Sequence, residues 1–162
     1  MPLTSPRPWT LWPLLAAAFV TSAQADDDRR SPRVPPLPAY VQECGACHLA
    51  YPPGLLPAAS WQRLTANLAR HFGTDASLDA ATRQALETWL VAHAGTSRKV
   101  SRDPTPPPED RISRAPWFQR EHREVPAAAW ARPAIQSASN CHACHPRADQ
   151  GDFSERDIRI PR

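Results

Sequence analysis

The pattern C-x-x-C-H, which occurs twice, constrains this chain more than any other feature. One copy lies in "QECGACHLAYPPG" and the other in "SNCHACHPRADQG", near the opposite end of the sequence. The two copies use all four cysteines of the chain, with Cys44, Cys47 and His48 in the first copy and Cys141, Cys144 and His145 in the second. The fold must therefore build the same kind of site twice.

The pattern is the one by which a c-type haem is attached. Two cysteine thioethers hold the porphyrin edge, and the histidine after the second cysteine reaches the iron from one face. Two residues between the cysteines let both sulfurs meet one porphyrin edge. We therefore predict two covalently attached haem c groups, with His48 and His145 as the proximal ligands.

Two other chemistries use C-x-x-C. A four-cysteine zinc ribbon separates its pairs by about 15 to 20 residues, far fewer than lie between Cys47 and Cys141, and it needs no histidine after each pair. A thioredoxin-like dithiol sits in a βαβ pattern, and no convincing strand flanks either motif. The repeated histidine favours haem over both. His142, between the second pair of cysteines, is expected to be a surface histidine.

Residues 1–25 have the pattern of an export signal. Arg7 precedes an apolar run over residues 11–20, and Ala23-Gln24-Ala25 forms a cleavage site. The run is too short to span a membrane, which favours cleavage over an uncleaved N-terminal anchor. We expect no stable membrane insertion once the signal is removed.

The composition limits how the core can form. The chain has 20 prolines and a net charge of +3, and large aliphatic residues are sparse after the signal. Such a chain would struggle to close a core from side chains alone, so we expect the cofactors to fill the middle. The small net charge argues against nucleic acid or an anionic membrane surface as a partner.

The second axial ligand of each iron can be approached by elimination. Met1 is the only methionine and belongs to the expected signal, which excludes the His/Met ligation found in many cytochromes c. Lys99 is the only lysine and lies in a polar segment, so it is a poor candidate. The sixth ligand is therefore a histidine, or the position is open.

Three histidines remain for the two sixth positions. A helix is expected from the N-cap Ser60 to the stop at Gly73, with His71 on its apolar face. A second helix is expected over residues 77–94, where His93 competes with His71 but also suits a C-terminal cap. His122 follows the proline-rich stretch 104–108 and lies among charged residues. On pattern alone it is equally a solvated residue or a ligand, although few other histidines remain in that half.

Several longer stretches resemble the dihaem cytochrome c family of small exported bacterial electron carriers. They are "CGACHLAYPPGLLPAASWQRL", "HFG" with the following "SLD", "RISRAPWFQREH" and "CHACHPRADQGDFSERDIRIP". The haem motifs are common to many cytochromes, whereas the tyrosine-diproline segment, the Ser60-Trp61 pair and the closing "GDF…RIP" are more specific. The resemblance covers nearly all of the chain after the signal.

The resemblance implies a mainly α fold, with an N-terminal cytochrome-c-like helical haem domain and a smaller, loop-rich C-terminal haem segment. On this basis we expect a proline-rich lead over 26–38, the first haem domain over 39–100, a proline-rich linker over 101–110 and the second haem segment over 111–162. It also implies that both irons have two histidine ligands. His71 would serve the first haem and His122 the second.

The resemblance further implies electron transfer in the periplasm. The donor would be a membrane cytochrome b, and the acceptor a monohaem oxygen-binding c-type cytochrome. A rival interpretation is a haem enzyme or gas-binding protein, peroxidase-like or binding oxygen or nitric oxide, with one open coordination site. That alternative requires His71 or His122 to be a structural residue, and no added acid–base constellation accompanies either motif.

Overall fold

The computed structural model describes residues 34–162. Within this range the chain forms α-helices and 3-10 turns but no strand, apart from an isolated bridge between His71 and Thr74. The predicted mainly α fold is confirmed. The expected signal over 1–25 and most of the expected lead over 26–38 lie outside the described residues.

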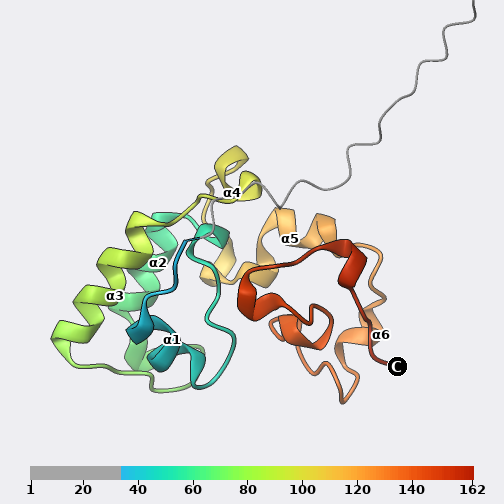
Figure 1. Ribbon diagram of the computed structural model, residues 1–162, viewed down its shortest axis with the longest axis horizontal. Helices are drawn as coiled ribbons and strands as arrows, with labels where there is room; N and C mark the ends of the chain where they lie inside the picture. The colour runs from blue at the N-terminus through green and yellow to red at the C-terminus, as the bar shows by residue number, and fades with distance from the viewer. Residues whose placement is uncertain (1–33) are drawn as a thin grey trace, which may run out of the picture.

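Three helices build the N-terminal half: α1 (Pro38–Gly45), α2 (Ala58–Ala66) and α3 (Ala80–Ala92). Helices α2 and α3 pack side by side, and α1 lies across their end (Figure 1). Their shared core consists of buried residues from all three helices and the loop between the first two: Tyr40, Leu56, Trp61, Leu86 and Leu90.

The boundaries of α2 differ from the prediction. Ser60 is not the N-cap but lies inside α2, fully buried, because the helix already starts after Pro57. The helix also ends early, since Asn67 leaves the helical region with φ −127° and ψ 33°, a conformation that asparagine tolerates well because its side chain competes for backbone hydrogen bonds. A short 3-10 turn, η3 (Leu68–Arg70), follows, and His71 comes directly after it.

Helix α3 matches the prediction more closely. Asp79 caps its N-terminus, its side chain accepting hydrogen bonds from the backbone N–H groups of Ala81 and Thr82. Gly95, beyond the C-terminus, has φ +65°, which glycine adopts without steric cost. The helix therefore covers all but the ends of the expected 77–94 span.

The loop between α1 and α2 carries the chain past the first motif. Within it, the turn η2 (Pro53–Leu55) is fixed to α2 because the indole N–H of Trp61 donates to the carbonyl of Pro53 at 2.8 Å. Gly54 lies against the segment that follows α3, where a Cβ would come within 2.5 Å of the Thr96 hydroxyl. Only glycine fits this approach without a shift.

Short elements and loops make up the C-terminal half. They are α4 (Arg98–Arg102), η4 (Pro108–Asp110), η5 (Ile112–Arg114), α5 (Pro116–Glu121), α6 (Ala127–Trp130), η6 (Cys141–Ala143), η7 (Ala148–Gln150) and η8 (Glu155–Asp157). The tail folds back over the second motif, since Arg147 pairs with Asp152 and Asp157 and the N–H of Arg159 donates to the carbonyl of Cys144 at 2.9 Å. The domain limits expected at 39–100, 101–110 and 111–162 stay a prediction.

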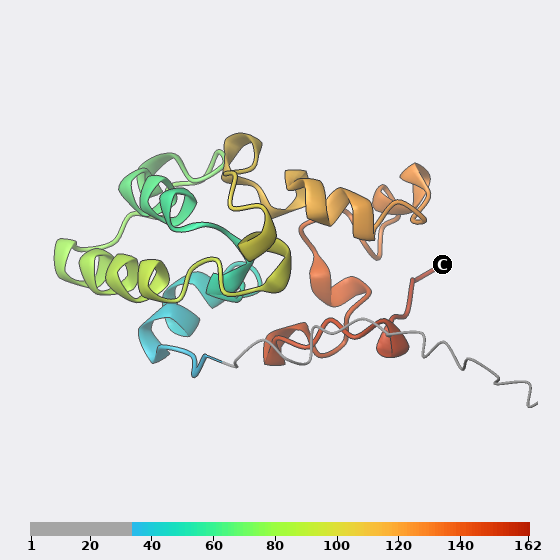
Figure 2. The ribbon, with the colours of Figure 1, turned by 90° about the horizontal axis from the view of Figure 1, so that it is seen from above.

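The two halves lie beside each other in both ribbon views (Figures 1 and 2). The Arg63 guanidinium on α2 binds the Asp110 carboxylate through two hydrogen bonds of 2.6 and 2.9 Å. A second tie runs from the Tyr51 hydroxyl to the carbonyl of Ser139 at 2.7 Å. These two ties hold the halves that carry the two motifs against each other. Within the C-terminal half, Lys99 of α4 lies 3.6 Å from Glu121 of α5.

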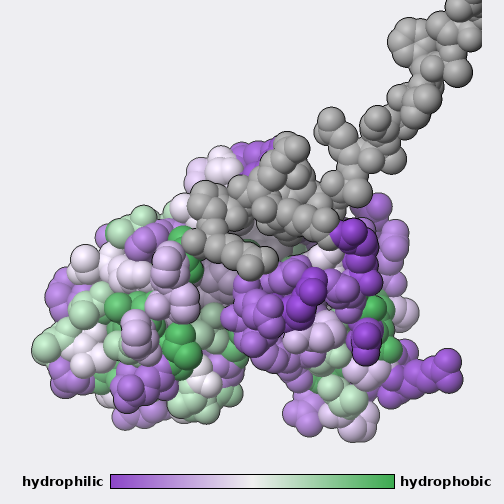
Figure 3. All heavy atoms as spheres, viewed as in Figure 1, coloured by the Kyte–Doolittle hydropathy of each residue, from purple (hydrophilic) through white to green (hydrophobic). Residues whose placement is uncertain are grey.

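Hydrophilic side chains gather over the C-terminal segment on the face shown in Figure 3, whereas apolar ones are scattered over the N-terminal helices. Four large hydrophobic side chains are exposed among the described residues: Val41, Phe72, Ile158 and Ile160. Of the helices within 34–162, none has the length and hydropathy needed to cross a membrane.

Candidate haem-binding sites

Each motif is presented by a tight turn. Cys44 lies in the last turn of α1, and the turn after that helix carries Cys47 and His48. In the second motif the N–H groups of Cys144 and His145 both donate to the carbonyl of Cys141, at 3.2 and 2.8 Å. None of the four cysteines is in a disulfide. Each turn thus carries two thiols and a histidine within five residues.

A second histidine faces each motif histidine. His48 and His71, here called the first histidine pair, have ring centroids 6.0 Å apart and ring planes 24° apart. His122 and His145, the second histidine pair, have centroids 6.2 Å apart and planes 76° apart. The fold thus brings together residues that are far apart in the sequence, in the pairing that the resemblance implied.

The spacing within both pairs suits a metal ion between the rings. A metal–imidazole bond is about 2 Å long, so two imidazoles on opposite sides of one iron have ring centroids roughly 6 Å apart. Within residues 34–162 no three or more histidine, cysteine or acidic side chains are grouped to hold a metal ion. Histidines in twos suit an iron whose other four positions belong to a porphyrin.

The hydrogen bonds of the rings also suit ligation. The Nδ1 atoms of His48 and His122 lie 2.7 and 2.8 Å from the carbonyls of Leu49 and Phe118. If Nδ1 carries the proton and donates it there, Nε2 keeps its lone pair for a metal. The Nδ1 atoms of His71 and His145 are buried and have no hydrogen-bond partner within the described residues.

Burial disfavours the protonated form of one ring in each pair. It lowers the pKa of His71, with a further contribution from the nearby His48. Burial likewise lowers the pKa of His145, to which His122 adds. A neutral imidazole can bind a metal, whereas a protonated one cannot.

His93, the competitor in the sequence, has the same local geometry as His122 but a different environment. Each residue follows the last turn of a helix, and the His93 Nδ1 lies 2.8 Å from the carbonyl of Trp89, four residues earlier. Within residues 34–162 the ring of His93 packs on Trp89, and no histidine faces it. Its position therefore suits a helix cap.

The free thiols do not resemble those of a redox dithiol. Burial raises the pKa of Cys44 to about 11, and burial also raises that of Cys141 to about 11. Reactive C-x-x-C thiols instead have lowered pKa values. His142 is exposed, as expected for the residue between the attaching cysteines.

Aromatic residues line both pairs. Tyr51 stacks on His48 with centroids 5.1 Å apart, and Phe118 stacks on His122 at 3.9 Å. The ring centroid of Trp130 lies 5.9 Å from that of His122, and the ring centroid of Phe153 lies 5.4 Å from that of His145. Tyr51 and Phe153 belong to segments that the resemblance marked as specific, but their contacts with the histidines were not predicted. Trp130 reaches the site only through the fold.

Near the first pair, the Arg111 guanidinium lies 4.0 Å from the centre of the Phe72 ring. Phe72 follows His71 and contacts it edge to face at 4.8 Å. The same guanidinium pairs with Glu109 at 3.1 Å, so an ion pair lies beside the first pair.

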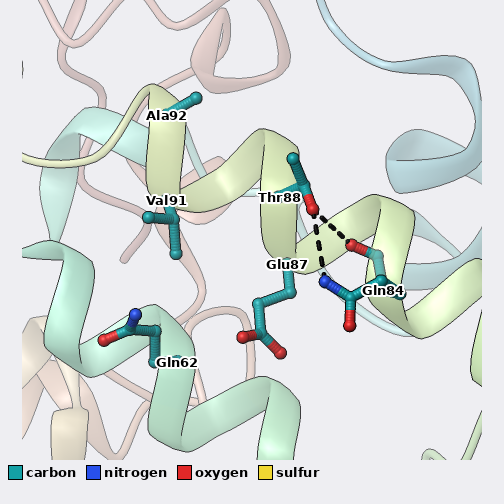
Figure 4. Close-up of a pocket in the computed structure, with 6 residues that line it drawn as sticks. All are labelled: Gln62, Gln84, Glu87, Thr88, Val91 and Ala92. Carbon is teal, nitrogen blue, oxygen red and sulfur yellow. Dashed lines mark hydrogen bonds between the residues drawn. The ribbon is translucent and has the colours of Figure 1, made fainter.

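A separate hollow between α2 and α3 is lined by Gln62, Gln84, Glu87, Thr88, Val91 and Ala92 (Figure 4). The polar groups of α3 there are largely satisfied locally: the Thr88 hydroxyl donates to the carbonyl of Gln84, and Glu87 accepts from Thr65 and Arg83. No cysteine or histidine lines it, so this hollow is not a haem site.

Comparison with known proteins identifies the family. The dihaem cytochrome c family matches residues 40–153, a span that includes both motifs. The chain is similar to the crystal structure of a dihaem cytochrome c from Rhodobacter sphaeroides, with 45% identity over 74% of this chain and 99% of that one and a TM-score of 0.63. A dihaem cytochrome c from Shewanella baltica is 39% identical over 79% of this chain and 95% of that one, with a TM-score of 0.67. No curated protein sequence matches.

These matches confirm the prediction of two covalently bound haem c groups. The residues fit such groups, because each motif turn presents two cysteines and a histidine and a second histidine faces it at the spacing described above. The function that follows is that of a dihaem electron carrier. The chain belongs to the dihaem cytochrome c family.

Proposed function

We propose that this chain is a periplasmic electron carrier in which each haem iron is held between two histidines. The first histidine pair would bind the haem attached to Cys44 and Cys47, and the second pair the haem attached to Cys141 and Cys144. The observation that carries the proposal is the facing of each motif histidine by one other histidine, with centroids 6.0 and 6.2 Å apart.

Each bound haem c supplies a one-electron couple between ferric and ferrous iron. The chain's own residues would hold the ligating imidazoles through the backbone hydrogen bonds of His48 and His122 and through the buried Nδ1 edges of His71 and His145. Ligands fixed in this way need little rearrangement when the charge changes, which favours rapid transfer. Two histidine ligands also leave the reduction potential of the iron lower than one histidine and one methionine do.

The partners that we propose are a membrane cytochrome b as donor and a monohaem oxygen-binding c-type cytochrome as acceptor. Family membership and the expected signal support this assignment. The hydrophilic surface of the C-terminal segment in Figure 3 suits the small, transient interfaces of redox partners. Cell fractionation tests the location, since the proposal requires the mature protein in the periplasmic fraction with its first 25 residues removed.

The test of the function is a potentiometric titration of the holoprotein, combined with a peroxide-turnover assay. We expect two reversible one-electron steps at low reduction potential. We also expect no more peroxide consumption than the same amount of free haem in solution shows. One haem that stays high-spin and turns over peroxide would replace electron transfer with the enzyme alternative.

A further inference from the structure

Tyr51 links the two histidine pairs. Its ring stacks on His48, with centroids 5.1 Å apart and planes 27° apart. Its hydroxyl donates to the carbonyl of Ser139 at 2.7 Å, a contact between residues 88 positions apart in the chain. Ser139 lies two residues before Cys141, so the opposite ends of one side chain touch a ligand of the first site and the attachment loop of the second.

The backbone of Tyr51 is also held. Tyr40, only 3% exposed, donates its hydroxyl to the carbonyl of Tyr51 at 2.8 Å. Two residues later, the carbonyl of Pro53 accepts from the buried indole of Trp61. A ring fixed at both its backbone and its hydroxyl has little freedom to turn, so it can impose an orientation on the imidazole stacked against it.

The loop at the far end is shaped around the same carbonyl. The oxygen of Ser139 accepts from the N–H of Cys141 at 3.0 Å as well as from Tyr51. The N–H of Asn140 is bonded to the carbonyl of Ser137, also at 3.0 Å. The Tyr51 hydroxyl thus adds a tertiary bond to a turn that is otherwise held by local bonds.

The two motif histidines have different aromatic neighbours. Tyr51 stacks on His48 with planes 27° apart, and the planes of the first pair are nearly parallel, at 24°. In the second pair Phe118 stacks on His122, but Phe153 meets His145 edge to face at 68°, and the planes of the pair are nearly perpendicular, at 76°. An imidazole can rotate about its bond to a metal, so the Tyr51 ring and the contact of Nδ1 with the Leu49 carbonyl together limit the His48 plane.

We propose that Tyr51 is a positioning residue that sets the ring plane of the His48 ligand and ties the first haem site to the attachment loop of the second. The proposal rests on the proposed ligation by the first histidine pair. It assigns Tyr51 two separable tasks: the ring orients His48, and the hydroxyl anchors residues 139–141.

Two variants of the holoprotein separate these tasks. Tyr51→Leu removes the aromatic stack, and we expect the low-spin electron paramagnetic resonance signal of the first haem to shift its g-values, because these report the angle between axial imidazoles. Tyr51→Phe keeps the ring, so that signal should stay, but backbone amides at 140 and 141 should exchange hydrogen about five-fold faster, the effect of one lost hydrogen bond.

Thr88→Val is the matched control, because it deletes a hydroxyl-to-carbonyl bond, to Gln84 on α3, that does not involve Tyr51. We expect unchanged exchange at 140 and 141 in this variant. Equal acceleration in Thr88→Val and Tyr51→Phe would overturn the anchoring, and unchanged g-values in Tyr51→Leu would overturn the orientation. If Tyr51→Leu fails to take up haem, the Tyr51→Phe comparison still decides the anchoring.

The failure of the underlying ligation would look different. If the first histidine pair did not share an iron, the wild-type protein itself would lack one of its two low-spin signals. The Tyr51 variants are therefore interpreted only against a wild type that shows both.

Discussion

Replacing His71 with alanine should open one of the two haems and leave the other closed. The His71 ring is the imidazole that faces His48, with centroids 6.0 Å apart, and the alanine side chain retains no nitrogen to replace it. The neighbouring Phe72 offers no ligand either. Because one haem in two loses its sixth ligand, the reduced His71→Ala protein should bind one carbon monoxide per chain, where the wild type binds none.

The assay is a carbon monoxide titration of the dithionite-reduced holoprotein, followed in the haem absorption bands. His93→Ala is the matched control, because His93 shares the helix-end geometry of a candidate ligand but no histidine faces it within residues 34–162. It should bind no carbon monoxide. No carbon monoxide bound by His71→Ala would refute the reasoning, and one equivalent bound by His93→Ala would make His93 the ligand.

Three further predictions concern the ring planes, the core and the boundary between the halves. The oxidised wild type should show two distinct low-spin electron paramagnetic resonance signals, a rhombic one from the first histidine pair and one with a much larger maximum g-value from the second. The second signal differs because near-perpendicular imidazole planes leave two iron d orbitals almost equal in energy. Two identical signals would contradict the interplanar angles of 24° and 76°. Trp61→Phe should lower the free energy of unfolding by about 1 kcal/mol in denaturant titrations, because the carbonyl of Pro53 loses its buried indole donor and keeps only the longer bond from the Leu56 N–H. An unchanged midpoint would show that the indole bond is dispensable. Asp110→Asn should lower the free energy of unfolding by about 1 kcal/mol at neutral pH, a small value because the Arg63 side chain is half exposed. The difference in unfolding free energy between this variant and the wild type should vanish in acid. A difference that stays constant with pH would show that charge is not its cause.

The sign of that pH dependence follows from the pKa of Asp110. Burial opposes ionisation of this carboxyl, but the hydrogen bonds and charge of Arg63 outweigh it and lower the pKa. A carboxyl with a lowered pKa in the folded state stabilises the fold above its ordinary value of about 4. This contribution is lost as the pH falls below that value and through the lowered folded pKa.

The sequence predicted the chemistry of the attachment sites because that chemistry is local. Two cysteines and a histidine within five residues suffice to define a haem c motif, and the family match confirms that the chain carries two haem c groups. Helix α3 was also predictable, since its periodicity, the stop at Gly95 and the preceding turn residues all agree.

The remainder depends on tertiary contacts. Ser60 has the residue type of an N-cap, yet Pro57 starts α2 before it and packing buries it. His93 and His122 end their helices in the same manner, so local pattern could not separate them. What distinguishes them is that the imidazole of His145 faces His122, and the placement of His145 depends on the whole fold.

Tyr51 illustrates the same limit at the boundary between the halves. Its position three residues after His48 is visible in the sequence, but the acceptor of its hydroxyl lies near the other motif. Periodicity and spacing carry no signal for a single bond between such distant residues. Only the packing of the two halves reveals it.

The central claim, two histidines on each iron of an electron carrier, is tested most directly by the absorption spectrum of the reduced wild-type holoprotein before and after exposure to carbon monoxide. The account predicts sharp low-spin bands from two haems that carbon monoxide leaves unchanged. A shift in half of the haem would contradict it, because one iron would then have an open position and the chain would be a gas-binding protein or an enzyme.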